Sequence, residues 1–516
     1  MTLGGWSGAH VVRVDVRAVS SWSTTEASKP VGTSTSVETS KPTEASTPVK
    51  VWPVAQSGQV DAADHRPNRG PKLSGPNRTG GGAVRSTSGL ASFSRPTSLG
   101  GSGVNVDALA QESFASGQPS DVSAAVGPRY FVEAVNSRLA AYTRTGTERC
   151  TVALAALFGA EATDLSGPRV QYDAVHDRYS LVAMAPATTA QEPARLYLAT
   201  TRGANPCATW WVYVVTLQGT LFPSGGWLDH PYLGQDPQSL LLSANVFRDS
   251  AYVGSMALAL PKAAVYGGVV FDVPAFPVGF STAPVTTTVI GDDSYYMAAV
   301  PHVGYRIYRM VNSAGPGTVL LDEGTIASPF AAPSRRARQC TGATLDPLDG
   351  RITSPPVRIG DYLWFTHGFD SGGRPGIRYG AIGVFTHSVY LGRVAHSSTS
   401  DDFNPSIGVS DAGYGLNYVW LNWVFTDTGA RPCVDVTAVV DGVDPGEGIP
   451  DLLGTGTILV HGGATDTDAP FGRYSSVSVD QWGRRSCPTG AAAVMAQQYF
   501  GTDGRWRTRI GRLESC

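Results

Sequence analysis

Short strand patterns separated by turns run through most of the chain, and residues 120–146 show the plan in its simplest form. Two short runs, residues 130–136 and 138–143, are rich in apolar and β-forming residues. A Gly-Pro turn at residues 127–128 precedes the first run, and Arg-Thr-Gly at residues 144–146 follows the second. Runs of this length between such turns predict a meander of antiparallel strands.

The same plan recurs between residues 104 and 513 in about seven units of roughly 40 to 60 residues. Each unit carries two to four strand patterns separated by Gly, Pro, Asn or Asp. One such unit cannot bury both of its faces alone, and radial stacking of several units leaves only short, protected edges. The pattern predicts an all-β fold, a β-propeller of about seven blades, with six or eight blades as alternatives.

Residues 19–103 have a different composition, rich in Ser, Thr, Pro, Gly and Lys. Such a tract buries too little apolar surface to offset the entropy of ordering, so we expect it to be a disordered linker or stalk. The glycosylation sequon at Asn77 falls inside it. The predicted domains are a mostly disordered leader, residues 1–103, and a propeller, residues 104–516.

Composition supports this picture and excludes some partners. The chain has 60 Gly and 35 Pro but only 16% charged residues, which favours turns over long helices. A formal net charge of −3 provides no field that would hold a phosphate backbone, so nucleic acid is not an expected partner. No run of about 18 apolar residues occurs, so no membrane-spanning helix is expected.

The six cysteines are widely spaced and contain no Cys-x-x-Cys pair, which argues against a zinc or redox site. Six cysteines allow about 15 pairings, and the sequence selects none of them. Residues 1–20 lack a clear signal-peptide pattern, so an export route is not evident in them.

Several phrases of the chain resemble a family of secreted bacterial β-propeller proteins of largely unassigned function, distantly similar to sialidase-like propellers. They include Ala-Val-Gly-Pro-Arg-Tyr-Phe-Val-Glu-Ala-Val-Asn-Ser at 125–137, Asp-His-Pro-Tyr-Leu-Gly-Gln-Asp at 229–236, Phe-Asn-Pro-Ser-Ile-Gly-Val at 403–409 and Arg-Tyr-Ser-Ser-Val-Ser-Val-Asp at 473–480. The resemblance implies a propeller at an extracellular or cell-surface location. It supplies no catalytic set to carry over.

Glycoside hydrolysis needs two carboxyl groups with different pKa values, and propeller loops can place them at the central mouth. The candidate acids are Asp229, Asp236, Asp292, Asp293, Asp401 and Asp402. The chain contains only partial matches to the sialidase-like motif Ser-x-Asp-x-Gly-x-x-Trp. An Asp in a propeller turn more often closes that turn by hydrogen bonds to nearby backbone N–H groups. We assign ligand binding, without catalysis, to Asp229, His230, Asp401 and Asp402.

A calcium loop is a second candidate site. Residues 441–451, Asp-Gly-Val-Asp-Pro-Gly-Glu-Gly-Ile-Pro-Asp, place hard oxygen ligands between glycines that permit a tight turn. The predicted ligands are Asp441, Asp444, Glu447 and Asp451. The competing interpretation is a solvated acidic loop between blades.

The leading functional hypothesis is a monomeric, non-catalytic propeller that binds a carbohydrate or a protein outside the cell. The alternative is a glycan-active enzyme, similar to a sialidase, that uses carboxylates at the propeller mouth. Two acidic side chains from different blades that converge beside an Arg or an exposed aromatic residue would favour the enzyme.

Overall fold

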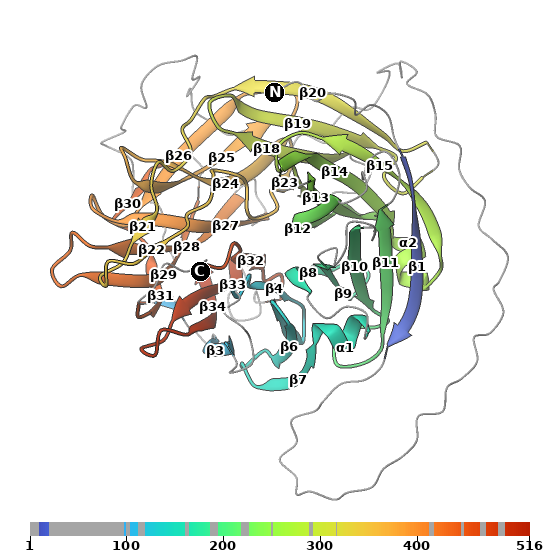
Figure 1. Ribbon diagram of the computed structural model, residues 1–516, viewed down its shortest axis with the longest axis horizontal. Coiled ribbons are helices and arrows are strands. Elements are labelled where there is room, and N and C mark those ends of the chain that lie inside the picture. Colours follow the sequence, from blue (N-terminus) through green and yellow to red (C-terminus); the bar gives the residue numbers. More distant parts are fainter. Residues whose placement is uncertain are drawn as a thin grey trace, which may run out of the picture.

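The computed structural model describes residues 10–19, 98–99 and 104–515. Gaps in that description lie at 112–118, 160–164, 186–193, 218–225, 249–250, 288–292, 316, 412–416, 445–447, 465–470 and 483–490. Four-stranded antiparallel sheets surround a central axis like the blades of a propeller (Figure 1). Most of the predicted leader, including Asn77, lies outside the described residues.

The first four blades follow one another along the chain, each from an inner to an outer strand. Blade 1 holds β4 (Ser123–Val126), β5 (Tyr130–Val135), β6 (Arg138–Thr143) and β7 (Glu148–Ala153), and the short helix α1 (Leu154–Phe158) follows. Blade 2 holds β8 (Ser166–Asp173), β9 (Arg178–Ala185), β10 (Ala194–Thr201) and β11 (Trp210–Leu217). Blade 3 holds β12 (Gly226–Gln235), β13 (Ser239–Arg248), β14 (Ala251–Pro261) and β15 (Phe271–Val278), with helix α2 (Lys262–Gly267) before its last strand. Blade 4 holds β16 (Ala283–Pro284), β18 (Ser294–Val300), β19 (Gly304–Val311) and β20 (Val319–Ala327).

Blades 5 and 6 carry short additional strands. Blade 5 holds β23 (Val357–Ile359), β24 (Tyr362–Asp370), β25 (Pro375–Gly383) and β26 (Val389–Ala395), flanked by β17 (Thr286–Thr287) and β30 (Leu452–Leu453). Blade 6 holds β27 (Asp401–Asp411), β28 (Asn417–Asp427), β29 (Val434–Val443) and β31 (Thr457–His461). A separate two-stranded ladder joins β21 (Ala337–Arg338) to β22 (Thr344–Leu345).

Blade 7 closes the ring with strands from distant parts of the chain. Its strands β32 (Ser476–Val479), β33 (Ala491–Phe500) and β34 (Trp506–Ser515) are completed by β3 (Asn105–Ala110), which pairs with β34, as does β2 (Ser98–Leu99). The described residues therefore form seven blades, which confirms the predicted fold.

Middle strands of the blades are apolar on both faces because each blade is covered by a neighbour on either side. All ten residues of β33 are buried, and eight of the ten residues of β13 are buried. The outer strand β20, in contrast, has only half-buried and exposed positions. The apolar core is consequently divided into clusters that lie between neighbouring blades.

One disulfide connects neighbouring blades, and a second connects the β21–β22 ladder to blade 6. Cys150 of blade 1 is bonded to Cys207 of blade 2, and Cys340 is bonded to Cys433 at the edge of blade 6. Cys487 and Cys516 lie outside the described residues. No helix of the described part of the chain is long and apolar enough to cross a bilayer.

One strand from the predicted leader belongs to the propeller. Strand β1 (His10–Val19) lies between β11 and β15 and pairs antiparallel with both, which joins blades 2 and 3 into one nine-stranded sheet. In Figure 1 it runs along the outer edge beside these two strands. A described strand therefore lies at residues 10–19, within the leader predicted for residues 1–103.

Candidate functional site

Three inner strands, β8, β12 and β27, each contain a residue in the left-handed conformation at a shift in strand register. Gly167 has a φ of 62°, His230 of 55° and Asn404 of 53°, and each of them directly precedes a proline. Proline then fixes the next φ, so the three blades share the same local change of backbone direction. Asp121, with a φ of 46°, lies just before β4.

Arg169 holds several blades together at this point. Its Nε donates to the carbonyl oxygen of Pro231 at 3.1 Å, and its Nη2 donates to that of Thr353 at 2.7 Å. The guanidinium carbon lies 3.2 Å from the ring centroid of Tyr474, a cation–π contact. The side chain of Arg169 is buried, and it connects β8 with segments of blades 3, 5 and 7.

A cluster of charged and aromatic residues surrounds this arginine, and we call it the axial cluster: Asp121, Asp229, His230, Arg473 and Tyr474. The backbone N–H of Arg473 donates to Asp121 at 2.7 Å, and its guanidinium pairs with Asp229. Asp121 and Asp229 belong to blades 1 and 3, so two acids from different blades converge on one arginine. The arginine side chain is 33% exposed, which leaves it accessible from solvent.

His230 is the least usual member of the axial cluster. It is fully buried, and neither ring nitrogen has a hydrogen-bond partner among the described residues. Its ring packs edge-on against Tyr474 with centroids 4.7 Å apart. Burial, reinforced by the positive charges of Arg351, Arg169 and Arg473, lowers the pKa of His230 well below its usual value, so the ring is neutral.

On the other side of Arg169, the inner strands enclose a cavity of about 470 Å³, which we call the axial cavity. Residues from the inner strands of six blades line it, together with Thr286 and Thr287 of β17. Its outer end is formed by turns that include the exposed residues Val175 and Gln481, so it opens to solvent there. Arg169 lines the cavity at its buried end.

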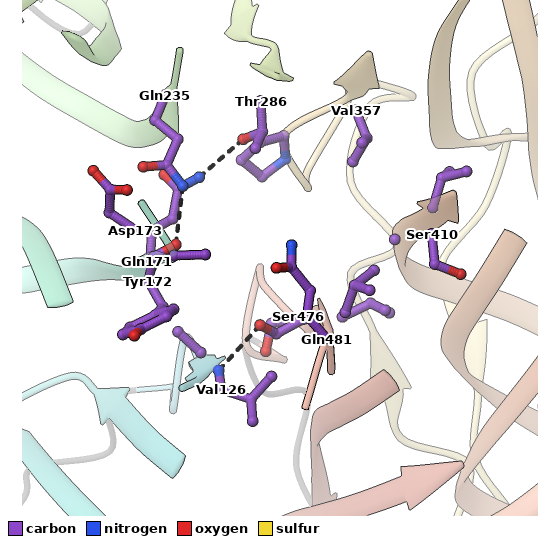
Figure 2. A pocket seen from close by; sticks show the side chains of 18 of the residues that line it. Val126, Gln171, Tyr172, Asp173, Gln235, Thr286, Val357, Ser410, Ser476 and Gln481 are labelled. Atoms are coloured by element: carbon purple, nitrogen blue, oxygen red, sulfur yellow. Dashed lines mark hydrogen bonds between the residues drawn. The ribbon is translucent and has the colours of Figure 1, made fainter. Parts of the chain in front are cut away.

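Uncharged polar groups dominate the cavity wall (Figure 2). Gln171 donates from its amide nitrogen to Thr286 Oγ1 at 3.1 Å, and Gln235 donates to the carbonyl oxygen of Tyr172 at 2.9 Å. The amide oxygens of both glutamines are buried and have no partner within the described ranges. Because buried polar atoms are usually hydrogen-bonded, these two oxygens are unsatisfied acceptors beneath the surface of the wall.

Serine hydroxyls and apolar side chains make up most of the remaining wall. The hydroxyl-bearing residues include Ser123, Ser354, Ser410, Ser476 and Ser478, and the apolar ones include Val126, Val170, Val357, Ile407, Val409 and Val477. Tyr172 and Trp482 meet edge to face near the outer end, with ring centroids 5.3 Å apart. The cavity combines polar groups in fixed positions with apolar and aromatic surface, as small-molecule sites do.

The carboxylates that line the cavity are bound by other protein groups. Asp173 contacts the ammonium of Lys262 at 2.7 Å and accepts from the Tyr266 hydroxyl at 2.8 Å. Burial alone would raise the pKa of Asp173, but Lys262 and its hydrogen bonds lower it, so the group is a carboxylate.

The other two carboxylates of the wall are held in the same way. Asp480 pairs with Arg144 and with Arg512. Asp236 accepts from the backbone N–H groups of Gln238 and Ser239, each at 2.6 Å. None of the three is placed as a free acid or base.

The residues predicted to bind ligand lie in two different places. Asp229 and His230 belong to the axial cluster. Asp401 instead pairs with Arg335, and Asp402 accepts from the backbone N–H of His396 at 3.0 Å and from the Trp423 indole at 3.1 Å. Burial raises the pKa of Asp402 to about 7.

Among the other candidate acids, Asp293 pairs with Arg309 at 2.7 Å, and Asp292 lies outside the described residues. Asp236 closes a turn, as described above.

The predicted calcium ligands are spread along one segment. Asp441 is buried in β29, Asp444 follows that strand, and Asp451 pairs with Arg393 at 3.0 Å. Glu447 lies outside the described residues. Within those residues, no three His, Cys, Asp or Glu side chains lie close enough together to hold a metal ion. The calcium loop stays a prediction.

Sequence reasoning missed Arg169 and the two cavity glutamines. The glutamines precede an aspartate turn in two consecutive blades, as Gln-Tyr-Asp at 171–173 and Gln-Asp at 235–236. A glutamine shortly before an aspartate turn in both blades was the sequence pattern that could have identified them. The acidic residues were selected instead because glycoside hydrolysis requires carboxylates.

No protein-family model matches the chain, and no curated protein matches its sequence. Solved structures with a similar arrangement include the Trypanosoma rangeli sialidase in complex with sialic acid, at 9% identity over 80% of this chain and 59% of that one, with a TM-score of 0.36. The GH43 endo-arabinanase of Bacillus licheniformis shares 12% identity over 63% of this chain and 94% of that one, with a TM-score of 0.29.

A subtype N11 neuraminidase-like protein of a flat-faced bat virus shares 9% identity over 70% of this chain and 98% of its own, with a TM-score of 0.35. The chain spans about three fifths of the length of the sialidase. It is therefore similar at low identity to sialidase, neuraminidase-like and GH43 propellers, and its site is argued from its own residues.

Proposed function

We propose that this propeller binds a carbohydrate in the axial cavity. The observation that carries the proposal is a cavity wall that sets serine hydroxyls and the side chains of Gln171 and Gln235 beside apolar and aromatic surface. Sugar hydroxyls donate and accept hydrogen bonds without carrying charge, and their C–H faces pack on apolar and aromatic surface. Such a ligand matches an uncharged polar and apolar wall and needs no counter-charge.

The cavity supports binding better than hydrolysis. Glycoside hydrolysis needs one carboxylic acid to protonate the leaving group and a second carboxylate to act as base or nucleophile. Asp173, Asp236 and Asp480 are the described carboxylates of the wall, and each is held by cations or N–H groups. A sugar bound there contacts no free acid among the described residues.

Glycan-array binding followed by calorimetry on the full chain tests the proposal. Gln235→Leu removes a buried acceptor, so we expect the Kd of the best glycan to rise about 10-fold or more. Gln238→Leu is the matched control, because Gln238 is exposed and does not line the cavity, and we expect less than about a 2-fold change. Failure of the wild-type protein to bind any glycan, or equal binding by the Gln235 variant, would overturn the proposal.

A second candidate function, glycoside hydrolysis, is favoured by the axial cluster. Asp121 and Asp229 come from different blades and converge on Arg473, which is the arrangement that would favour an enzyme. If this cluster acts on glycans, Asp121→Asn and Asp229→Asn each abolish turnover, whereas Asp503→Asn, on an exposed turn, leaves it unchanged. Absence of turnover on a panel of glycosides would reject this function and leave the binding proposal standing.

We also infer an extracellular or cell-surface location. Disulfides persist in oxidising compartments, and two are described here, Cys150–Cys207 and Cys340–Cys433. A fractionation experiment with an antibody against the propeller tests this inference, and recovery only in the cytosol would contradict it.

A further inference from the structure

Strand β1 occupies a slot between two blades, and its backbone is paired on both sides. Residues 13–19 pair with β11 in the register Asp15↔Val214, and residues 10–14 pair with β15 in the register Val12↔Val273. Because both pairings are antiparallel, β1 supplies the hydrogen-bonding edge that β11 and β15 would otherwise leave open. Open strand edges accept other strands readily.

The side chains of β1 fit the slot as well as its backbone does. Val12 and Val14 are buried in the apolar cluster between blades 2 and 3, whereas Asp15 is exposed. This is the alternation of a strand that covers a core on one face. The slot therefore selects an extended segment with apolar residues at every second position.

The connection to the rest of the chain does not require β1 to come from the same molecule. Residues 20–97 separate β1 from β2 on blade 7. At about 3.3 to 3.6 Å per residue this segment can extend over more than about 200 Å, whereas a compact domain of this size has a radius of gyration of about 22 Å. The same chain length that reaches its own slot can reach the slot of a neighbour.

We propose that the groove between β11 and β15 is a strand-accepting site whose occupant can be the β1 of a second copy of this chain. The contacts are the same whether β1 comes from its own chain or from a neighbour. The balance between the two is set by the effective concentration of the chain's own β1, which falls with the length of the connection. Crowded copies, as on a surface, are linked by exchanged strands.

Single-cysteine variants of the full chain distinguish the two sources of β1. Asp15→Cys is placed in one copy and Val214→Cys in a second, differently tagged copy, both with Cys487 and Cys516 replaced by Ser. Asp15 is exposed and Val214 is half-buried, and the two positions are register partners, so an exchanged strand brings the thiols together. We expect a reducible mixed dimer whose yield rises with protein concentration.

The control replaces Val214→Cys by Val175→Cys, which is exposed but lies outside the slot. A mixed dimer no more abundant than in this control overturns the proposal. The double variant Asp15→Cys/Val214→Cys tests the register within one chain. If the double variant forms an internal disulfide while no mixed dimer appears at any concentration, β1 pairs only within its own molecule and the proposal is wrong.

A peptide experiment tests the slot itself. A fluorescent peptide of residues 10–19 is titrated onto the full chain carrying Val12→Asp and Val14→Asp, with circular dichroism to verify folding. We expect binding at least about 10-fold tighter than to the wild-type chain, whose slot is filled, and no binding by a peptide carrying the same two substitutions. Equal or absent binding of the native peptide to both folded proteins contradicts a strand-accepting site.

Discussion

Replacement of Arg169 is the sharpest test of how the blades are held together at the axis. The side chain makes two hydrogen bonds to carbonyl oxygens of blades 3 and 5 and stacks on Tyr474 of blade 7. Each hydrogen bond from a charged donor contributes about 1.5 to 3 kcal/mol, and a desolvated cation–π contact contributes about 2 kcal/mol. Against this stands the cost of burying a guanidinium without a carboxylate partner, which is several kcal/mol.

The net effect follows from these opposing terms. We expect Arg169→Ala to lower the free energy of unfolding by about 2 to 3 kcal/mol, because the three contacts disappear together and a gap remains at the axis. At an unfolding entropy of about 2.1 cal/mol/K per residue, this corresponds to a drop in Tm of about 2 to 3 °C for a chain of this size. Arg129→Ala is the control, since that side chain is 60% exposed, and a surface ion pair contributes about 0 to 1 kcal/mol.

Scanning calorimetry measures the Tm of Arg169→Ala, of Arg129→Ala and of a third variant, Arg169→Met. Methionine keeps the length of the side chain but removes the charge and the donors. If the methionine and alanine variants are both as stable as the wild type, desolvation outweighs the contacts and Arg169 does not hold the blades together. The arginine would then be explained by a ligand at the buried end of the axial cavity.

Three further predictions concern the core and the blade interfaces. Burial raises the pKa of Glu133 to about 7 from an ordinary 4.5, so the folded state holds this proton more tightly and loses stability as the pH rises between these values. Glu133→Gln should therefore reduce the stability difference between pH 5 and pH 8 by about 2 to 3 kcal/mol in urea titrations, and an unchanged difference would refute this. Gly268→Ala would place its Cβ 2.3 Å from the Trp211 ring, whereas Gly372→Ala, also at positive φ, meets open space, so the first should cost about 2 kcal/mol more in the same titration. Replacing the cysteine pair of either disulfide by serine should cost about 2 to 4 kcal/mol, and a loss under about 0.5 kcal/mol would show that the blades need no covalent link.

Local features of the fold were predictable because turns and strand composition are written in neighbouring residues. The runs at 130–136 and 138–143 correspond to β5 (Tyr130–Val135) and β6 (Arg138–Thr143). Pairing over long distances was not predictable. β1 lies in the predicted leader and was not predicted as a strand, and no local pattern identifies β11, β15 or β34 as the partners of β1 and β3.

The candidate site was predictable only in part. Carboxylates were selected because hydrolysis requires them, and the structure places Asp229 with Asp121 around Arg473 but holds Asp401 against Arg335. Whether an acid is free depends on cations from other blades, which no sequence pattern locates. Neutral groups such as Gln235 carry no such marker, since an amide becomes informative only when its burial and its missing partner are known.

Closure of the ring by β3 and β34 orders events during synthesis. Residues 105–110 leave the ribosome first, and their partners at 507–511 follow about 400 residues later, roughly 20 to 80 seconds at ordinary translation rates. Until then the nascent blades form an open arc, and the apolar face of blade 1 that blade 7 later covers stays uncovered. An mRNA truncated before the codon for residue 506 therefore yields an open arc with exposed apolar faces at its two ends, not a smaller closed ring. Chaperones that shield apolar surface are needed most by the nearly complete chain.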